Sequence, residues 1–250
     1  MGRWSRRIAA EFVDWLDKPP ELDWLEIGCG SGALTSQILS IANPRRLDSV
    51  DPSEGFVQTT TENIVDDRLF VSVGNSEHLE FPDASKSVVV SGLVLNFIEN
   101  RDLALSEMMR IVKPGGTVAF YVWDYPDAGV EFMRHFWSAA IQCDPDAIQF
   151  TEGKRFSWCN EGELKSIATN AELTNITSRA IEVPSIFNSF DDYWRPFTLG
   201  VGPAPGYCAN LPAQKREEIR ATLEKQLPQS ADGSIHLNLR AWAVAGEVHT

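Results

Sequence analysis

The stretch 25–33 reads Leu-Glu-Ile-Gly-Cys-Gly-Ser-Gly-Ala, and it decides the fold. A short buried strand is expected at 22–27; it ends in glycines at alternate positions, and apolar residues at helical spacing follow directly. Glycine accepts positive φ and lets a ligand approach the main chain, while the free N–H groups of a helix N-terminus attract anionic groups. A strand, a bare loop and a helix in this order predict a ligand site at the edge of an open α/β sheet.

The rest of the first half repeats this alternation of strand and helix. Residues 87–95 (SVVVSGLVL) are nearly all apolar, as is typical of a parallel strand that is buried on both faces. Further strands are expected at 47–50, 69–73 and 117–123, and helices at 33–41, 55–65 and 103–112. A first helix is expected before Pro19, with Ile8, Phe12, Val13 and Leu16 on its apolar face. The pattern predicts an α/β fold with a doubly wound, mostly parallel sheet.

Beyond Trp123 the pattern is looser. Helices are expected at 130–141, 161–170 and 215–227, and strands at 173–183 and 235–248. The segment 187–207 is rich in aromatic residues and prolines. These rings fit either the core of a cap or an apolar lid over a ligand.

Two acidic residues narrow the choice of ligand for the glycine loop. The spacing is GxGxG, with Ala33 where the dinucleotide fingerprint GxGxxG places its last glycine. Glu26 stands two residues before the first glycine, and Asp51 ends the second strand, where a carboxylate can accept bonds from both hydroxyls of a ribose. We therefore expect a ligand that contains a ribose and carries an amino-acid group in place of a pyrophosphate.

Five motifs in order resemble a known family. They are ExGxGxG at 26–32, the acid at Asp51, Gly-Asn-Ser-Glu at 74–77, SGLVLNF at 91–97 and Lys-Pro-Gly-Gly at 113–116. With this set, the stretch 4–124 resembles the class I S-adenosylmethionine-dependent methyltransferases, and most of all their small-molecule branch, often called type 11. The resemblance implies one methyltransferase domain over 1–250 with a Rossmann-like, seven-stranded sheet. Residues 1–124 would form the cofactor-binding half, and a helical cap insertion at 125–160 and 184–232 would bind the substrate.

The resemblance also assigns cofactor-binding residues. Gly28, Cys29, Gly30 and Gly32 would pass beneath the methionine part of S-adenosylmethionine, with the Cys29 side chain as a small space-filler. Glu26 would lie near the ammonium, through a water molecule, and Asp51 would hold the ribose hydroxyls. The other implied positions are Pro52 and Ser53 beside the adenine, Asn75, Ser76 and Glu77 at the adenine edge, and Ser91, Gly92 and Leu93 at the methionine end. Many relatives have Asp where this chain has Asn75, so the adenine amino group would meet an acceptor without charge.

Methyl transfer from a sulfonium needs no acid, because the departing thioether is neutral. A base is needed only where the acceptor must lose a proton, as a hydroxyl or an ammonium must. His135, Asp124 and Tyr125 lie on or before the helix that follows the fifth strand, so they are the candidates for this role.

Composition limits the partners. The chain has 250 residues and a formal net charge of −13, which disfavours a nucleic acid or an anionic membrane. Its four cysteines form no CxxC pair, and no His/Asp/Glu cluster has metal-ligand spacing, so we expect no metal. Without a secretory signal or an apolar run of 18 residues, we expect a cytoplasmic protein with a small-molecule acceptor. The oligomeric state cannot be read from the sequence.

Three functions remain open at this point. The first is an S-adenosylmethionine-dependent methyltransferase that acts on a small organic molecule and releases S-adenosylhomocysteine. The second is a non-catalytic module that retains the cofactor site, since no side chain is obligatory for the transfer. The third is a nucleotide-dependent oxidoreductase, against which Ala33 and the position of Glu26 argue.

Overall fold

The computed structural model describes residues 2–127, 129–200 and 202–249, with no description of the side chains of Gly2 and Arg3. These residues form two compact units. Unit 1 holds the described residues within 1–122, 161–181 and 241–250, and unit 2 holds those within 123–160 and 182–240. Strands β6 and β7 begin in one unit and end in the other.

The sheet has seven strands within the described residues, in the order β3-β2-β1-β4-β5-β7-β6. Their bounds are β1 Asp23–Ile27, β2 Arg46–Asp51, β3 Leu69–Val73, β4 Lys86–Gly92, β5 Val112–Trp123, β6 Thr174–Phe187 and β7 Ile235–Glu247. β1 pairs in parallel with β2 and β4, β2 with β3, and β4 with β5. Hydrogen bonds join Gly115 to Val248 and Asp124 to Arg240, so β7 runs antiparallel to β5. The mostly parallel, seven-stranded sheet is confirmed.

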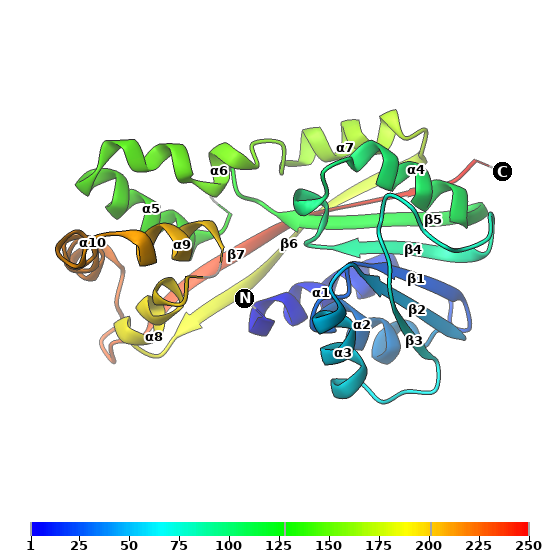
Figure 1. The fold of residues 1–250 in the computed structure, drawn as a ribbon, viewed down its shortest axis with the longest axis horizontal. Helices are drawn as coiled ribbons and strands as arrows, with labels where there is room; N and C mark the ends of the chain where they lie inside the picture. Colours follow the sequence, from blue (N-terminus) through cyan, green and yellow to red (C-terminus); the bar gives the residue numbers. More distant parts are fainter. Residues whose placement is uncertain (1, 128, 201, 250) are drawn as a thin grey trace. The chain divides into compact units, whose positions relative to one another are not determined.

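Helices cover both faces of the sheet in unit 1. Figure 1 shows α1, α2 and α3 along one face and α4 and α7 along the other. Their bounds are α1 Gly2–Leu16, α2 Ala33–Gln37, α3 Glu54–Asn63, α4 Arg101–Ile111 and α7 Glu161–Asn170. The expected apolar face of α1 is buried at all four of its positions. Side-chain caps start two of these helices, because Ser53 accepts the N–H of Phe56 and Asn100 accepts that of Leu103.

Three expected elements have different ends in the structure. The helix predicted at 33–41 is α-helical only to Gln37 and continues as a π-helical turn, Ile38–Ala42. The strand predicted at 87–95 ends at Gly92, because Leu93 adopts a φ of +62° and a 3₁₀ turn follows at Leu95–Phe97. The strand predicted at 117–123 begins at Val112, because Val112 already pairs with Lys86 of β4.

Unit 2 is built of helices around a cluster of aromatic rings. Its helices are α5 Glu131–Cys143, α6 Glu152–Arg155, α8 Phe190–Trp194, α9 Pro203–Asn210 and α10 Ala213–Gln226, with 3₁₀ turns at Pro145–Phe150 and Arg195–Thr198. The Phe136 and Phe197 rings stack at 4.4 Å between centroids, and the buried Tyr193 hydroxyl donates to the Phe132 carbonyl at 2.6 Å. The rings of 187–197 therefore form the core of unit 2.

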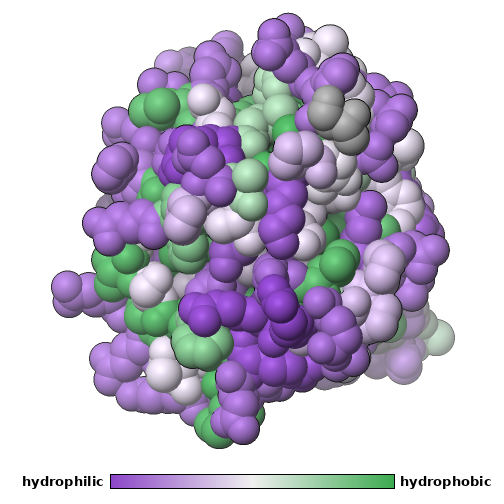
Figure 2. Space-filling view, turned by 90° about the vertical axis from the view of Figure 1, so that its right-hand side faces the viewer, coloured by the Kyte–Doolittle hydropathy of each residue, from purple (hydrophilic) through white to green (hydrophobic). Residues whose placement is uncertain are grey.

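Hydrophilic residues predominate on the face shown in Figure 2, where hydrophobic residues lie in separate small patches. That face offers no broad apolar surface. No helix among the described residues is long and apolar enough to cross a membrane.

Candidate functional site

A cavity of about 450 Å³ lies in unit 1 at the carboxyl ends of β1, β2 and β4. This volume is within the range of small-ligand sites, roughly 300–1,000 Å³. Eight of the residues predicted for the cofactor line it: Glu26, Gly28, Cys29, Gly30, Asp51, Pro52, Gly92 and Leu93. The sheet thus brings together residues from three separate strand ends, as an open α/β fold does at its ligand crevice.

The three loop glycines have positive φ, but different surroundings. A Cβ on Gly28 would lie 2.4 Å from Val94, and one on Gly32 would lie 2.6 Å from Ile64, so both positions are closed by packing. A Cβ on Gly30 would meet no atom within 4 Å. Gly30 is therefore the point where the main chain faces open space and where a ligand can approach it.

Asp51 ties the end of β2 to the glycine loop. Its Oδ2 accepts the N–H of Gly30 at 2.9 Å, and its Oδ1 accepts the N–H of Ser53 at 2.9 Å. The side chain is almost wholly buried and lines the cavity. Each carboxylate oxygen has a second lone pair, so the group can still accept bonds from ligand hydroxyls.

Glu26 places a second carboxylate beneath the loop. Its Oε2 accepts the hydroxyls of Thr35 at 2.6 Å and Ser49 at 2.8 Å. Burial raises the pKa of Glu26 to about 7, although both hydroxyl bonds act to lower it. A ligand cation in the cavity would compensate this buried charge.

The Cys29 thiol is also buried, and burial raises its pKa to about 12. It therefore stays a neutral thiol, which suits a small packing group better than a nucleophile.

Six predicted residues do not line the cavity: Gly32, Ser53, Asn75, Ser76, Glu77 and Ser91. Ser53 caps α3, and three others also form side-chain hydrogen bonds within unit 1. Asn75 Oδ1 accepts the N–H of Glu77 at 2.9 Å, the Glu77 carboxylate accepts the N–H of Asn100 at 3.0 Å, and the Ser91 hydroxyl donates to the Ile27 carbonyl at 3.1 Å. Their contact with a cofactor stays a prediction.

Sequence reasoning missed several cavity residues, of which Tyr121 and Phe56 are the most informative. Tyr121 pairs with Gly92 across β5 and β4, and a Cβ on Gly92 would lie 2.5 Å from the Tyr121 hydroxyl. Burial raises the pKa of Tyr121 well above its ordinary value, so its hydroxyl remains a donor. The sequence signal for this contact was Gly92 at the end of a strand. It could not be interpreted without the register of β4 and β5, which places Tyr121 beside Gly92.

The three candidate bases lie in unit 2. Both oxygens of the buried Asp124 are engaged, since Oδ2 accepts Arg240 Nε at 2.6 Å and Oδ1 accepts the N–H of Asp127 at 3.2 Å. Burial raises the pKa of Tyr125 above its ordinary value and lowers that of His135. The geometry favours a structural role for Asp124, and a catalytic role for any of the three remains a prediction. No group of three metal-ligating side chains occurs in the part of the chain that the structure describes.

Comparison with known proteins identifies the domain around this cavity. Residues 25–120 match the family model described as "Methyltransferase domain". The chain is 27% identical over 147 residues to the human Thiol S-methyltransferase TMT1A, covering 56% of this chain and 58% of that protein. It is 26% identical over 122 residues to the Malonyl-[acyl-carrier protein] O-methyltransferase of Methylococcus capsulatus, covering 48% of this chain and 44% of that protein.

The chain thus spans about half the length of these curated relatives. The solved structure of the YcgJ protein from Bacillus subtilis has a TM-score of 0.64 at 16% identity, covering 98% of this chain and 99% of that one. This likeness shows a shared fold. The predicted resemblance to S-adenosylmethionine-dependent methyltransferases is confirmed by the domain match over residues 25–120 and by these relatives.

Proposed function

We propose that this chain transfers a methyl group from S-adenosylmethionine to a small organic acceptor by direct displacement, with S-adenosylhomocysteine as the second product. One observation carries the proposal. A single cavity is lined by Gly30, whose main chain faces open space, and by two buried carboxylates, Glu26 and Asp51. A nucleoside with a ribose and a cationic amino-acid tail needs this combination.

The residues present fit the cofactor. The Glu26 carboxylate would attract its ammonium group, because no cation of the protein pairs with Glu26 among the described residues. Asp51 would accept the ribose hydroxyls, with its position already set by the N–H groups of Gly30 and Ser53. Pro52 and the half-exposed Phe56 ring, which line the same cavity, offer an apolar surface to the adenine.

The work of the protein in this reaction is mainly positioning. S-adenosylmethionine supplies an electrophilic methyl group on a sulfonium, and the sulfur departs as a neutral thioether. Alignment of two reactants in one site contributes about 7–11 kcal/mol in favourable cases. For an acceptor that must lose a proton, His135, Asp124 and Tyr125 are the residues proposed to take it.

The acceptor is proposed to be a small molecule from the cytoplasm. A formal net charge of −13 disfavours a polyanionic acceptor such as nucleic acid. One relative is a human thiol S-methyltransferase, which supports the inclusion of thiols among the acceptors to be tested.

The proposal is tested by transfer of a labelled methyl group. The chain is incubated with methyl-labelled S-adenosylmethionine and a panel of thiols, amines, phenols and carboxylic acids, and labelled products are separated from the donor. We expect transfer to at least one class, and loss of that transfer in the Gly30→Ala variant. Tight binding of the donor with no labelled product across the panel would instead favour the non-catalytic module.

A further inference from the structure

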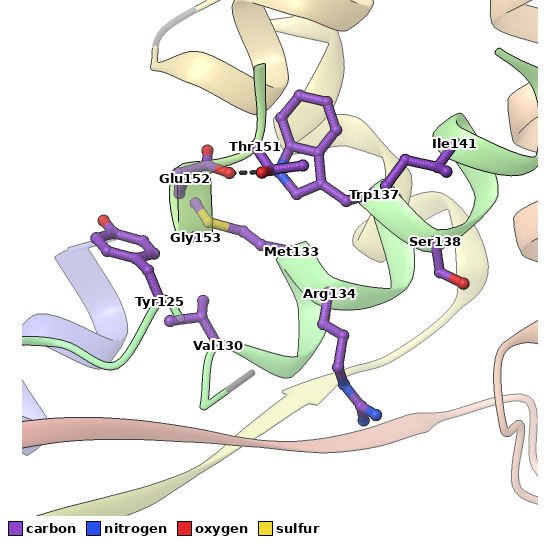
Figure 3. Close-up of a pocket in the computed structure, with 10 residues that line it drawn as sticks. All are labelled: Tyr125, Val130, Met133, Arg134, Trp137, Ser138, Ile141, Thr151, Glu152 and Gly153. Atoms are coloured by element: carbon purple, nitrogen blue, oxygen red, sulfur yellow. Dashed lines mark hydrogen bonds between the residues drawn. The ribbon is translucent and has the colours of Figure 1, made fainter. Parts of the chain in front are cut away.

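Unit 2 contains a cavity of its own, of about 280 Å³, which the proposed function does not use. It lies between the segment after β5, helix α5 and the short helix α6 (Figure 3). Tyr125, Met133, Trp137 and Glu152 are among the residues that line it. Its walls therefore combine aromatic rings, a thioether and a carboxylate.

Glu152 is the unusual member of this set, because it is an ionisable side chain that is only 2% exposed. The Trp137 indole N–H donates to its Oε2, and the N–H of Ala204 donates to its Oε1 at 3.1 Å. Burial raises the pKa of Glu152, while these two bonds act to lower it. Two neutral donors stabilise a carboxylate, but they do not compensate its charge.

Among the described residues, no cationic side chain forms an ion pair or a hydrogen bond with Glu152. Arg134 lines the same cavity, but its guanidinium pairs with Glu131 at 3.3 Å, and Figure 3 shows it extending away from Glu152. Arg155 follows Glu152 on α6, yet its guanidinium lies over the Phe156 ring, 5.2 Å from the centroid. It acts on Glu152 only weakly, as the smallest of the effects on that carboxyl.

The remaining walls suit the apolar body of a ligand. Val130, Met133 and Ile141 contribute aliphatic and thioether surface, and Tyr125 and Trp137 contribute rings that attract cations. A cavity of about 150 Å³ accommodates benzene. The volume here is therefore sufficient for an aromatic ring with a short amine chain.

We propose that this cavity binds a small organic ammonium ion, with its nitrogen against Glu152 and its apolar part against Val130, Met133 and Ile141. The proposal stands apart from the proposed function, because it concerns binding within unit 2 and needs no cofactor. A small organic ammonium ion would be the ligand of unit 2, in which no sequence motif is recognisable.

The test compares three probes of one shape and different charge, without cofactor. They are 2-phenylethylammonium, the neutral 2-phenylethanol and the anionic phenylacetate, titrated by calorimetry into the full chain. We expect the ammonium to bind about tenfold or more tightly than the alcohol, and phenylacetate not to bind, since a charged hydrogen bond is stronger than a neutral one.

Two variants locate the site. Glu152→Gln removes the charge, and we expect the ammonium and the alcohol then to bind within about threefold of each other. Glu217→Gln, at an exposed acid of the same unit, is the matched control and leaves the preference unchanged. Ser138→Trp, at an exposed cavity position on α5, fills the cavity without disturbing buried packing and abolishes binding of both probes.

Equal binding of ammonium and alcohol to the wild-type chain overturns the proposal, as does the absence of binding by all three probes. If Glu152→Gln does not fold, the probe comparison and Ser138→Trp still decide. Unchanged binding in Ser138→Trp would place the ligand elsewhere and contradict the assignment. A parallel titration with S-adenosylhomocysteine reports on the unit 1 cavity alone, so failure of either proposal is seen separately.

Discussion

Glu26 lies in β1 with its carboxyl group buried, so water does not solvate it. Its pKa of about 7 lies above the ordinary value of 4.5, because burial disfavours the charged form more than Thr35 and Ser49 stabilise it. The free protein therefore has this group partly protonated near neutral pH. A ligand ammonium in the same cavity would favour the charged form.

We expect the affinity for S-adenosylhomocysteine to fall as the pH falls below about 7, by up to roughly tenfold per pH unit, because protonated Glu26 offers no charge to the ammonium. Calorimetry between pH 5.5 and 8 measures this change. The matched control is 5′-methylthioadenosine, which lacks the amino-acid tail, and its affinity is expected to stay constant over the range. Parallel pH profiles for the two ligands would contradict the role of Glu26.

The same raised pKa affects the stability of the free protein. Between pH 4.5 and about 7 the folded state retains a proton on Glu26 that the unfolded chain has lost, so the contribution of this group to the free energy of unfolding falls as the pH rises. We expect Glu26→Gln to gain stability relative to the wild type across this window, by at most about 3 kcal/mol. Urea denaturation at pH 5 and pH 8 measures the difference, and a constant gap would contradict it.

The loop between β1 and α2 contains one glycine that the packing of the fold requires and another that the ligand cavity requires. The Gly28 position is filled by Val94, whereas the Gly30 position opens on the cavity, and both have positive φ. Alanine at either position would have the same type of backbone strain. The added Cβ would clash with Val94 at position 28 but would enter open space at position 30.

We expect Gly28→Ala to lower the melting temperature far more than Gly30→Ala does. Both substitutions add about 1–2 kcal/mol of left-handed backbone strain, but only the first also forces a side chain into Val94. Gly30→Ala is expected to keep its fold and weaken S-adenosylhomocysteine binding, because its methyl group occupies ligand space. Thermal unfolding and calorimetry on both variants test this. Full ligand affinity in a folded Gly30→Ala protein would show that the loop is only a turn.

Asp124 connects the segment after β5 to β7. It is fully buried, and its ion pair with Arg240 and its bond from Asp127 use both oxygens. We expect Asp124→Asn to lower the free energy of unfolding by about 2 kcal/mol, while the exposed Asp127→Asn control changes it little. Urea denaturation measures the effect. An Asp124→Asn protein of unchanged stability with much reduced methyl transfer would instead identify Asp124 as the base.

The strand and helix elements could be predicted from the sequence because each is a local pattern. The apolar run SVVVSGLVL indicated β4, and the glycine loop with Asp51 indicated the ligand crevice. The end of β4 could not be predicted, because Leu93 has a positive φ and its N–H bonds to a partner distant in sequence, the Tyr121 carbonyl, at 2.8 Å. The register that places Tyr121 beside Gly92 is likewise a property of the assembled sheet.

At the scale of the whole molecule, the chain divides into a unit with recognisable motifs and one without them. The motifs of unit 1 are short sequence patterns that set the main-chain geometry of the cofactor site. Each can therefore be recognised from the sequence alone. Unit 2 positions its rings and Glu152 through contacts distant in sequence, such as that of Glu152 with Ala204. The burial of Glu152 could not be predicted, because its sequence neighbours Thr151 and Gly153 give no sign of a buried position.

The proposed methyl transfer requires the unit 1 cavity to bind a sulfonium nucleoside through the glycine loop. Calorimetric titration of S-adenosylhomocysteine, with NAD as the competing ligand, tests it most directly in the wild type and in Asp51→Asn, with Asp67→Asn as the exposed control. We expect S-adenosylhomocysteine to bind and NAD not to bind, and we expect the affinity for S-adenosylhomocysteine to fall about tenfold or more in Asp51→Asn alone. Binding of NAD in preference to S-adenosylhomocysteine, or equal affinity in all three proteins, would contradict it.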